Sequence, residues 1–239
     1  MADNIPAGEV NLYNHMPQLK KDVYNQRSRC CWAIAVGTCI SYTYKLEVGE
    51  EIVEDFEVSP QDLIDRVWFY SSDEEKRMYE YDQWGVYSCG DARAYEYVRT
   101  KGVRLLKDCP FLDRRSDNIQ PIGKNEHRIY CAQYEELSLE QAVEKVQNFT
   151  PVTARVKVTA DFTTYKEGVY ERPNPPEIEI LGRHTVLIVG INVAEKYFVI
   201  RNSWGVKWGK EGYGLIRFNS IGRFAYTPMA WMEEFARVD

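Results

Sequence analysis

Three residues far apart in the sequence, Cys31, His184 and Asn202, carry side chains that together could perform nucleophilic catalysis. Cys31 begins a run of small and apolar residues that continues to Ile40, which predicts a helix buried on nearly every side. A thiol in the first turn of a helix lies near unpaired backbone N–H groups and the positive end of the helix dipole, and both favour the thiolate. His184 and Asn202 accompany strand-like runs. These residue types predict a thiolate–imidazolium pair oriented by an amide.

Each of these residues alone is more often an ordinary structural residue, since a buried cysteine usually acts as a small hydrophobic side chain. The prediction therefore depends on the set, and on the motifs around it. These are Gln26, Cys31-Trp32-Ala33, His184, Asn202-Ser203-Trp204-Gly205 and Trp208-Gly209-Lys210-Glu211-Gly212-Tyr213-Gly214. Together they resemble the papain family of cysteine peptidases, from about Val23 to about Phe218.

The resemblance implies an α+β fold with two lobes, one helical and one strand-rich and barrel-like, and an active-site cleft between them. We expect the helical lobe over residues 18–118 and the strand-rich lobe over residues 119–220, with the terminal segments 1–17 and 221–239 packing across the lobes. In the first lobe, Ser59 followed by Pro60 and Asp62 predicts a helix start, and the helix should run to about Tyr70.

Further elements follow from local patterns. We expect helices at Ala92–Thr100 and, capped by Ser138, at Leu139–Asn148. The expected strands are Val152–Val158, Val186–Ile191, Tyr197–Arg201 and Tyr213–Phe218. Residues 71–84 form a highly charged insertion that should be a solvated surface excursion. The tail, residues 228–239, is expected to be a short amphipathic helix.

The resemblance also implies a role for each catalytic residue. Cys31 attacks a carbonyl carbon as the thiolate, His184 protonates the leaving group, and Asn202 orients the imidazole ring. Gln26 forms the oxyanion hole with the backbone N–H of Cys31. Trp204 shields the contact between the amide and the imidazole from water.

Two departures from the family concern the peptide-binding parts. The stretch from Gln26 to Cys31 is one residue shorter than usual and carries Arg29-Cys30 in place of a Gly-Ser pair, so this loop must be rebuilt. The family's Cys-Asn-Gly-Gly, whose glycine backbone pairs with an extended substrate, is Cys89-Gly90-Asp91-Ala92 here. We therefore expect a thiol peptidase that is narrow in specificity or weak. The alternative is a papain-fold protein diverted to thiolate chemistry on a small anionic molecule, or to binding or storage without turnover.

The predicted substrate-binding residues are Arg155, Arg183, Gly182, Asp91, Trp204 and Trp208. By resemblance, Arg155 falls where relatives place an apolar residue in the main specificity pocket, and Arg183 falls where many carry an acid. Two guanidinium groups would attract a carboxylate or another anion. The alternative is that both arginines pair with the protein's own acids, such as Glu177 or Glu179.

Composition and the first residues limit the classes of partner and the cellular compartment that we expect. A net charge of −6 and a pI near 5.3 argue against nucleic acid or an anionic membrane. We expect no metal and no cofactor, and as partners a peptide or small-molecule substrate and protein inhibitors of thiol proteases. The first twenty residues carry no secretory signal, which predicts a cytoplasmic location, or a vacuolar or secreted one if a leader has been removed.

Six cysteines are present, yet the family's usual bridge positions are occupied by residues such as Ser28 and Arg66. Loss of these bridges suits a reducing compartment. A shifted bridge between Cys30 and Cys89 stays open, because pairing cannot be deduced from sequence.

Overall fold

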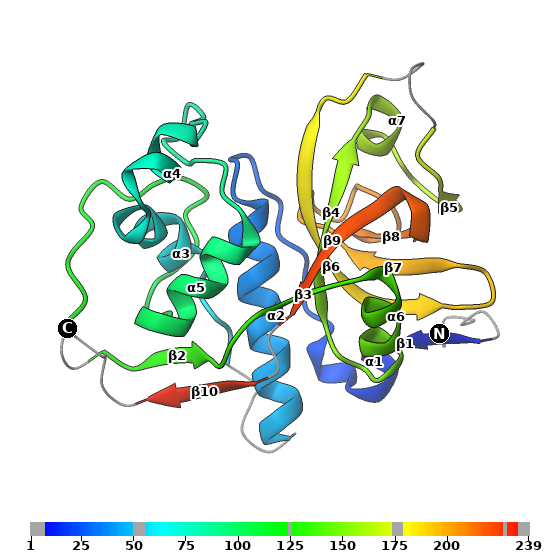
Figure 1. Cartoon of the computed structure of the whole chain (residues 1–239), viewed down its shortest axis with the longest axis horizontal. Helices are drawn as coiled ribbons and strands as arrows, with labels where there is room; N and C mark the ends of the chain where they lie inside the picture. Colours follow the sequence, from blue (N-terminus) through cyan, green and yellow to red (C-terminus); the bar gives the residue numbers. More distant parts are fainter. Residues whose placement is uncertain (1–7, 50–55, 124–125, 174–178, 227–228, 234–239) are drawn as a thin grey trace. The chain divides into compact units, whose positions relative to one another are not determined.

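The computed structural model describes residues 8–49, 56–123, 126–173, 179–226 and 229–233 (Figure 1). Its contacts divide the chain into two compact units. The strand-rich unit comprises Met1–Asn25 and Glu136–Phe224, and the helical unit comprises Gln26–Glu135 and Ala225–Asp239. Each unit thus combines segments from distant parts of the chain, whereas the two lobes expected from the sequence are contiguous. Helices in one unit and a large mixed sheet in the other confirm the predicted α+β class.

Helix α2 (Cys31–Val48) is the centre of the helical unit. Every residue from Trp32 to Lys45 is buried, which confirms the predicted helix without a solvent-exposed face. Helix α2 packs against α3 (Pro60–Arg66), α5 (Asp91–Lys101) and strand β10 (Ala230–Glu233). It ends at Gly49, which adopts a positive φ of 79°.

The other helices of this unit begin where capping residues predict. The Ser59 hydroxyl accepts a hydrogen bond from the backbone N–H of Asp62, and Pro60 occupies the first helical position of α3. The predicted single helix to Tyr70 is α3 followed by a 3₁₀ turn, η3 (Val67–Tyr70). The charged insertion contains the short exposed helix α4 (Asp73–Met78), and α5 ends at Gly102.

The tail of the chain differs from the prediction. Residues 230–233 form strand β10, which pairs antiparallel with β2 (Arg128–Cys131) in the register Ala230↔Cys131. An amphipathic helix is therefore wrong for this segment, because its backbone groups bond to a strand from another part of the sequence. The other residues of the predicted helix, 228 and 234–239, lie outside the described residues.

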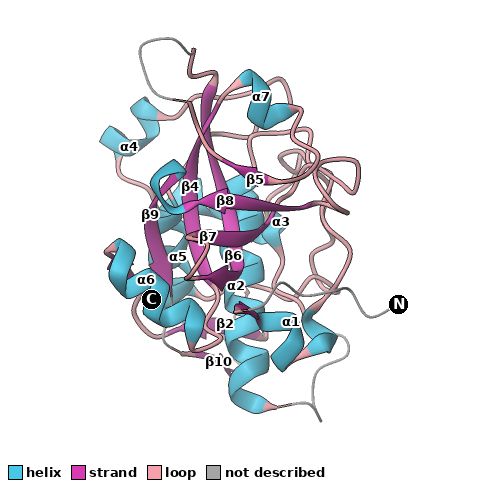
Figure 2. Cartoon of the chain, turned by 90° about the vertical axis from the view of Figure 1, so that its right-hand side faces the viewer, coloured by secondary structure: helices cyan, strands magenta, loops and turns pink. Residues whose placement is uncertain are grey.

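The strand-rich unit is built on a sheet of order β3-β9-β4-β6-β7-β8-β5, with β1 paired to β6 (Figure 2, strands in magenta). These strands are β1 (Glu9–Asn11), β3 (Glu135–Leu137), β4 (Val152–Val158), β5 (Val169–Tyr170), β6 (Gly182–Asn192), β7 (Tyr197–Arg201), β8 (Tyr213–Arg217) and β9 (Ile221–Tyr226). Strand β6 pairs antiparallel with β1, β4 and β7, and β7 pairs antiparallel with β8, whereas β5 and β8 are parallel. Strand β6 begins four residues before the predicted start, at Gly182, so His184 lies within it.

Short helices accompany this sheet. They are α1 (Leu12–His15), the 3₁₀ turn η1 (Pro17–Leu19), α6 (Leu139–Gln147), α7 (Ala160–Thr163) and the 3₁₀ turn η4 (Phe218–Ser220). Ser138 and Gln141 form a capping box at the start of α6, as the sequence predicts. Within the described ranges, no helix is long and apolar enough to cross a bilayer.

Candidate active site

His184 and Asn202 form a buried hydrogen-bonded pair in the strand-rich unit. His184 Nε2 lies 2.7 Å from Asn202 Oδ1, and the two residues are 4% and 2% exposed. His184 stands on β6 opposite Val156 of β4, and Asn202 directly follows β7, which also pairs with β6. The antiparallel pairing of β6 and β7 thus brings together two residues that are distant in the sequence.

The direction of this hydrogen bond follows from its acceptor. Asn202 Oδ1 also accepts the backbone N–H of Ser203 at 2.7 Å, which identifies this atom as the carbonyl oxygen. Because an amide oxygen can only accept, Nε2 of His184 must carry the proton. The other ring nitrogen, Nδ1, is then the one that can exchange a proton with a reacting group.

Trp204 lies over the imidazole ring of His184, with 4.4 Å between the ring centroids and 33° between the planes. The turn that carries it is fixed, because the N–H of Gly205 donates to the carbonyl of Tyr24 and Gly205 has a φ of +73°. A Cβ at Gly205 would approach Asn25 Oδ1 to 2.8 Å, so only glycine fits. The indole therefore covers the imidazole from a rigid position.

Trp208 supports this arrangement from the core. It is 4% exposed, and its indole N–H donates to the Phe162 carbonyl at 2.8 Å. The Phe162 ring contacts both Trp208 and Trp204, at centroid distances of 5.2 and 5.6 Å. The aromatic cluster encloses the side chain of Trp208, and its predicted contact with substrate stays a prediction.

In the helical unit, Cys31 is the first residue of α2 and is partly exposed. The following residue, Trp32, is 1% exposed, and its indole N–H donates to the carbonyl of Tyr87 at 2.9 Å. This bond fixes the first turn of the helix. The side chain of Gln26 donates from Nε2 to the carbonyl of Ser28 at 2.7 Å, which holds it against the loop that leads to Cys31.

That loop is held by the carboxylate of Asp113, a residue that sequence reasoning missed. Its Oδ2 accepts the backbone N–H of Arg27 at 2.6 Å, and its Oδ1 accepts the backbone N–H and the hydroxyl of Ser28 at 3.1 and 2.7 Å. Asp113 is 5% exposed. Burial alone would raise its pKa, but the hydrogen bonds from Ser28 and Arg27 outweigh burial and lower the pKa of this carboxyl.

A second carboxylate continues the pattern. Asp82 Oδ2 accepts the backbone N–H of Arg29 at 2.7 Å, while Oδ1 accepts those of Trp84 and Val86. Three successive backbone amides, from Arg27 to Arg29, thus donate to two carboxylates. Residues 71–84 are largely exposed, as expected for a solvated surface excursion, and Asp82 in this segment also holds the loop before Cys31.

All six cysteines are free thiols, so the bridge between Cys30 and Cys89 that the sequence left open is not formed. Burial raises the pKa of the Cys30 thiol well above its ordinary value and that of Cys89 to about 12. Both thiols therefore stay protonated near neutral pH. The family's bridge positions carry other interactions, since Ser28 bonds Asp113 and Arg66 forms a buried ion pair with Asp62.

The remaining predicted substrate contacts lie in different places. Arg155 and Arg183 come together in one pocket of the strand-rich unit, but Gly182 is exposed and does not line it. Asp91, the first residue of α5, is 5% exposed.

The sequence also offered two acids as alternative partners of Arg155 and Arg183. One of them, Glu177, lies outside the described residues. No ion pair joins Glu179 to Arg183 in the part of the chain that the structure describes.

No group of three or more His, Cys, Asp or Glu side chains that could hold a metal ion occurs among the described residues.

Comparisons with known proteins identify a family. The family model described as papain family cysteine protease matches residues 17–229. Mouse cathepsin K is 27% identical over 218 residues, which cover 84% of this chain and 56% of that protein. Bovine pro-cathepsin H is 32% identical over 129 residues, 52% of this chain and 38% of that protein. The chain thus spans about half the length, or less, of these curated relatives.

Two solved structures share the fold. The Carica candamarcensis cysteine protease CMS1MS2, solved in complex with E-64, has a TM-score of 0.66 at 19% identity, covering 94% of this chain and 99% of that one. Digestive procathepsin L 3 of Tenebrio molitor has a TM-score of 0.70 at 19% identity, covering 96% and 72%. At such identity the likeness concerns the fold.

Proposed function

Because the chain belongs to the papain family of cysteine proteases, we propose that it hydrolyses peptide bonds with Cys31 as nucleophile and His184 as its acid–base partner. The observation that carries the proposal is the buried contact of 2.7 Å between His184 and Asn202. It fixes the tautomer and the plane of the imidazole, which a proton-transfer catalyst needs before substrate arrives.

The reaction proceeds in two halves. Nδ1 of His184 takes the proton of the Cys31 thiol, and the thiolate adds to the carbonyl carbon of the peptide bond. The imidazolium then gives its proton to the leaving amine nitrogen, and the C–N bond breaks to leave a thioester. In the second half, His184 takes a proton from water, and the water oxygen attacks the carbonyl carbon of the thioester. The C–S bond breaks and the carboxylic acid product leaves. The Cys31 thiolate then takes the proton back from His184.

The negative charge on the substrate oxygen requires donors that are in place beforehand. We assign this role to the Gln26 side-chain amide and the backbone N–H of Cys31. Losing one such donor typically costs about 10²–10³ in turnover. The hydrogen bonds from Arg27, Ser28 and Arg29 to Asp113 and Asp82 support this role, because they fix the loop between the two donors.

The acceptable substrates should be few. Helix α5 begins at Asp91, directly after Gly90, so only a very short extended stretch precedes it. A short stretch offers few backbone groups for pairing with a peptide, which supports narrow or weak cleavage. The comparisons give no support to the alternative of binding or storage without turnover. A cytoplasmic location stays a prediction from the sequence.

The test is hydrolysis of a fluorogenic peptide library by the wild-type protein, Cys31→Ser and a control, Cys109→Ser. Cys109 is a partly exposed thiol, and the proposed mechanism does not use it. We expect the wild type and the control to cleave the same subset of peptides, and Cys31→Ser to lose about 10³-fold or more in kcat/KM. Equal cleavage by wild type and Cys31→Ser would contradict the proposal, as would a wild-type protein that cleaves no peptide.

A further inference from the structure

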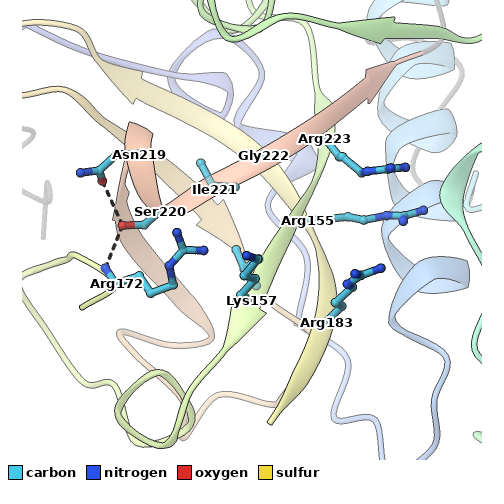
Figure 3. Close-up of a pocket in the computed structure, with 10 residues that line it drawn as sticks. Arg155, Lys157, Arg172, Arg183, Asn219, Ser220, Ile221, Gly222 and Arg223 are labelled. Carbon is cyan, nitrogen blue, oxygen red and sulfur yellow. Dashed lines mark hydrogen bonds between the residues drawn. The ribbon is translucent and has the colours of Figure 1, made fainter. Parts of the chain in front are cut away.

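A pocket in the strand-rich unit gathers five cationic side chains (Figure 3). It has a volume of about 330 Å³, and its charged lining residues are Arg155, Lys157, Arg172, Arg183 and Arg223. None of the ten described residues that line it is acidic. We call it the arginine pocket. It is an unusual concentration of positive charge for a chain whose net charge is −6.

The sheet itself places these residues together. Arg223 stands on β9, Arg155 and Lys157 on β4, and Arg183 on β6, which are three neighbouring strands. Lys157 and Arg183 are directly opposite in the register, and Arg155 is two residues from Lys157, so these three share one face. Figure 3 shows the side chains of Arg155, Arg183 and Arg223 extending to the same side.

This arrangement is unfavourable in the absence of an anion. Like charges directly opposite on paired strands repel each other, as Lys157 and Arg183 must. In the described part of the chain, Lys157, Arg183 and Arg223 have no carboxylate within ion-pair distance. Arg172 contributes a buried Nε without a hydrogen-bond partner among the described residues. A buried N–H without a partner is costly, so the Nε of Arg172 favours an incoming acceptor. Lys157, Arg183 and Arg223 are exposed, and an anion would reduce the repulsion between their charges.

Polar groups at the other end of the pocket are already ordered. The backbone N–H of Arg172 donates to Ser220 Oγ at 2.8 Å, and the Ser220 hydroxyl donates to Asn219 Oδ1 at 3.1 Å (Figure 3). These bonds fix the segment from which Arg172 extends. A bound anion would therefore meet donors whose backbone is already held, which lowers the entropic cost of binding.

We propose that the arginine pocket is a binding site for a compact group with two or more negative charges, such as a phosphate group or neighbouring carboxylates. Guanidinium groups bind such oxygens through pairs of parallel hydrogen bonds. The site goes beyond the proposed hydrolysis. His184 lies opposite Val156, so its side chain points to the other face of these strands. An anion in the pocket needs neither the thiol nor the imidazole.

The test measures binding in a Cys31→Ser background, which leaves peptides uncut and makes the result independent of the proposed hydrolysis. The probes are pyrophosphate, hexaglutamate and, as the neutral match, hexaglutamine, each followed by isothermal titration calorimetry. Arg183→Ala and Arg223→Ala should each weaken binding about tenfold. The control Arg99→Ala removes the same charge from an arginine that Glu96 pairs in the helical unit, and it should leave affinity nearly unchanged.

Thermal denaturation separates a binding site from a merely structural cluster. Without ligand, Arg183→Ala should melt at a higher temperature than its parent, because the repulsion with Lys157 is gone. With pyrophosphate the order should reverse, because ligand stabilises only the protein that binds it. A structural role for Arg183 would instead lower the melting temperature in both conditions.

Two outcomes support the site and identify the source of the anion. Binding of pyrophosphate without a preference for hexaglutamate over hexaglutamine indicates a free phosphate-type ligand, whereas a clear preference for hexaglutamate indicates an acidic segment of a peptide. The proposal is overturned if neither anion binds, or if Arg99→Ala weakens binding as much as the pocket variants do.

Discussion

The proposed catalytic residues of the two units are held by different kinds of interaction. In the strand-rich unit, His184 is fixed by a neutral amide and by aromatic rings, all on or beside strands. In the helical unit, the loop from Gln26 to Cys31 is fixed by two carboxylates that accept backbone N–H groups. One half depends on buried neutral packing and the other on charge. They should therefore respond differently to pH and to substitution.

Replacing Asn202 by alanine should break the histidine half most strongly. The imidazole would lose the acceptor that fixes its tautomer, and general acid–base catalysis is worth about 10²–10⁴, so kcat should fall at least about 10²-fold. Steady-state kinetics on any peptide that the wild type cleaves measures this. Asn148→Ala, an exposed asparagine of the same unit that lies outside the arginine pocket, is the control. A fall of only a few-fold would show that the ring is held by Trp204 alone.

Asp113→Asn should break the nucleophile half with a smaller loss of activity and a clear loss of stability. An amide offers one acceptor where the carboxylate offers two, so the N–H of Arg27 or Ser28 would lose its partner. Hydrogen bonds to a charged group are worth about 1.5–3 kcal/mol each, and we expect about 2 kcal/mol in the free energy of unfolding. We expect kcat to fall about tenfold, because the oxyanion donors are less well positioned.

Urea denaturation and kinetics with the same variant measure both effects. Asn tolerates the positive φ of 55° at this position, so backbone strain does not confuse the result. The matched control is Asp117→Asn, an exposed carboxylate that pairs with Arg114. Equal losses in both variants would contradict the special role of Asp113.

The pH dependence of stability sharpens the same contrast. The pKa of Asp113 is lowered in the folded state from its ordinary value of 3.8. The contribution of the Asp113 carboxylate to the free energy of unfolding is therefore complete at pH values above 3.8. This contribution is lost as the pH falls through the lower pKa of the folded state. Acid denaturation should show this loss in the wild type and a shallower pH dependence in Asp113→Asn. Identical acid profiles would mean that Asp113 is not charged in the folded protein.

Asp82→Asn should have the smallest effect. Asp82 is only half-buried and holds one backbone amide of the loop, that of Arg29, so we expect kcat/KM to fall about threefold with less than about 1 kcal/mol of destabilisation. A larger loss than in Asp113→Asn, measured by the same kinetics and urea denaturation, would reverse the order of importance of the two carboxylates.

Sequence reasoning succeeded where the determinants are local. The caps at Ser59 and Ser138, the buried helix after Cys31 and the strand Tyr197–Arg201 each follow from residues close in the sequence. The tail failed because β10 is defined by its pairing with β2, about a hundred residues earlier, and periodicity carries no trace of such a partner.

The site residues that the sequence did not predict were missed for the same reason, because their partners are distant in the sequence. Asp113 accepts hydrogen bonds from residues more than 80 positions away, and no local pattern marks it. Alternation in β4 put Arg155 and Lys157 on one face, but Arg172 and Arg223 join them only through the fold. The one signal in the sequence was Ser28, which stands where the family has a disulfide cysteine. A loop that lacks this disulfide needs another interaction to hold it, and here Asp113 provides it.

The central claim is that Cys31 is a thiolate activated by His184. Mass-mapped alkylation of the native protein with limiting iodoacetamide at neutral pH tests it most directly, in the wild type and in His184→Ala. We expect Cys31 to react first in the wild type, ahead of Cys30 and Cys89, whose thiol pKa values are raised, and to slow at least about tenfold in the variant. If another cysteine reacts first, or if Cys31 reacts equally fast without His184, the claim is contradicted.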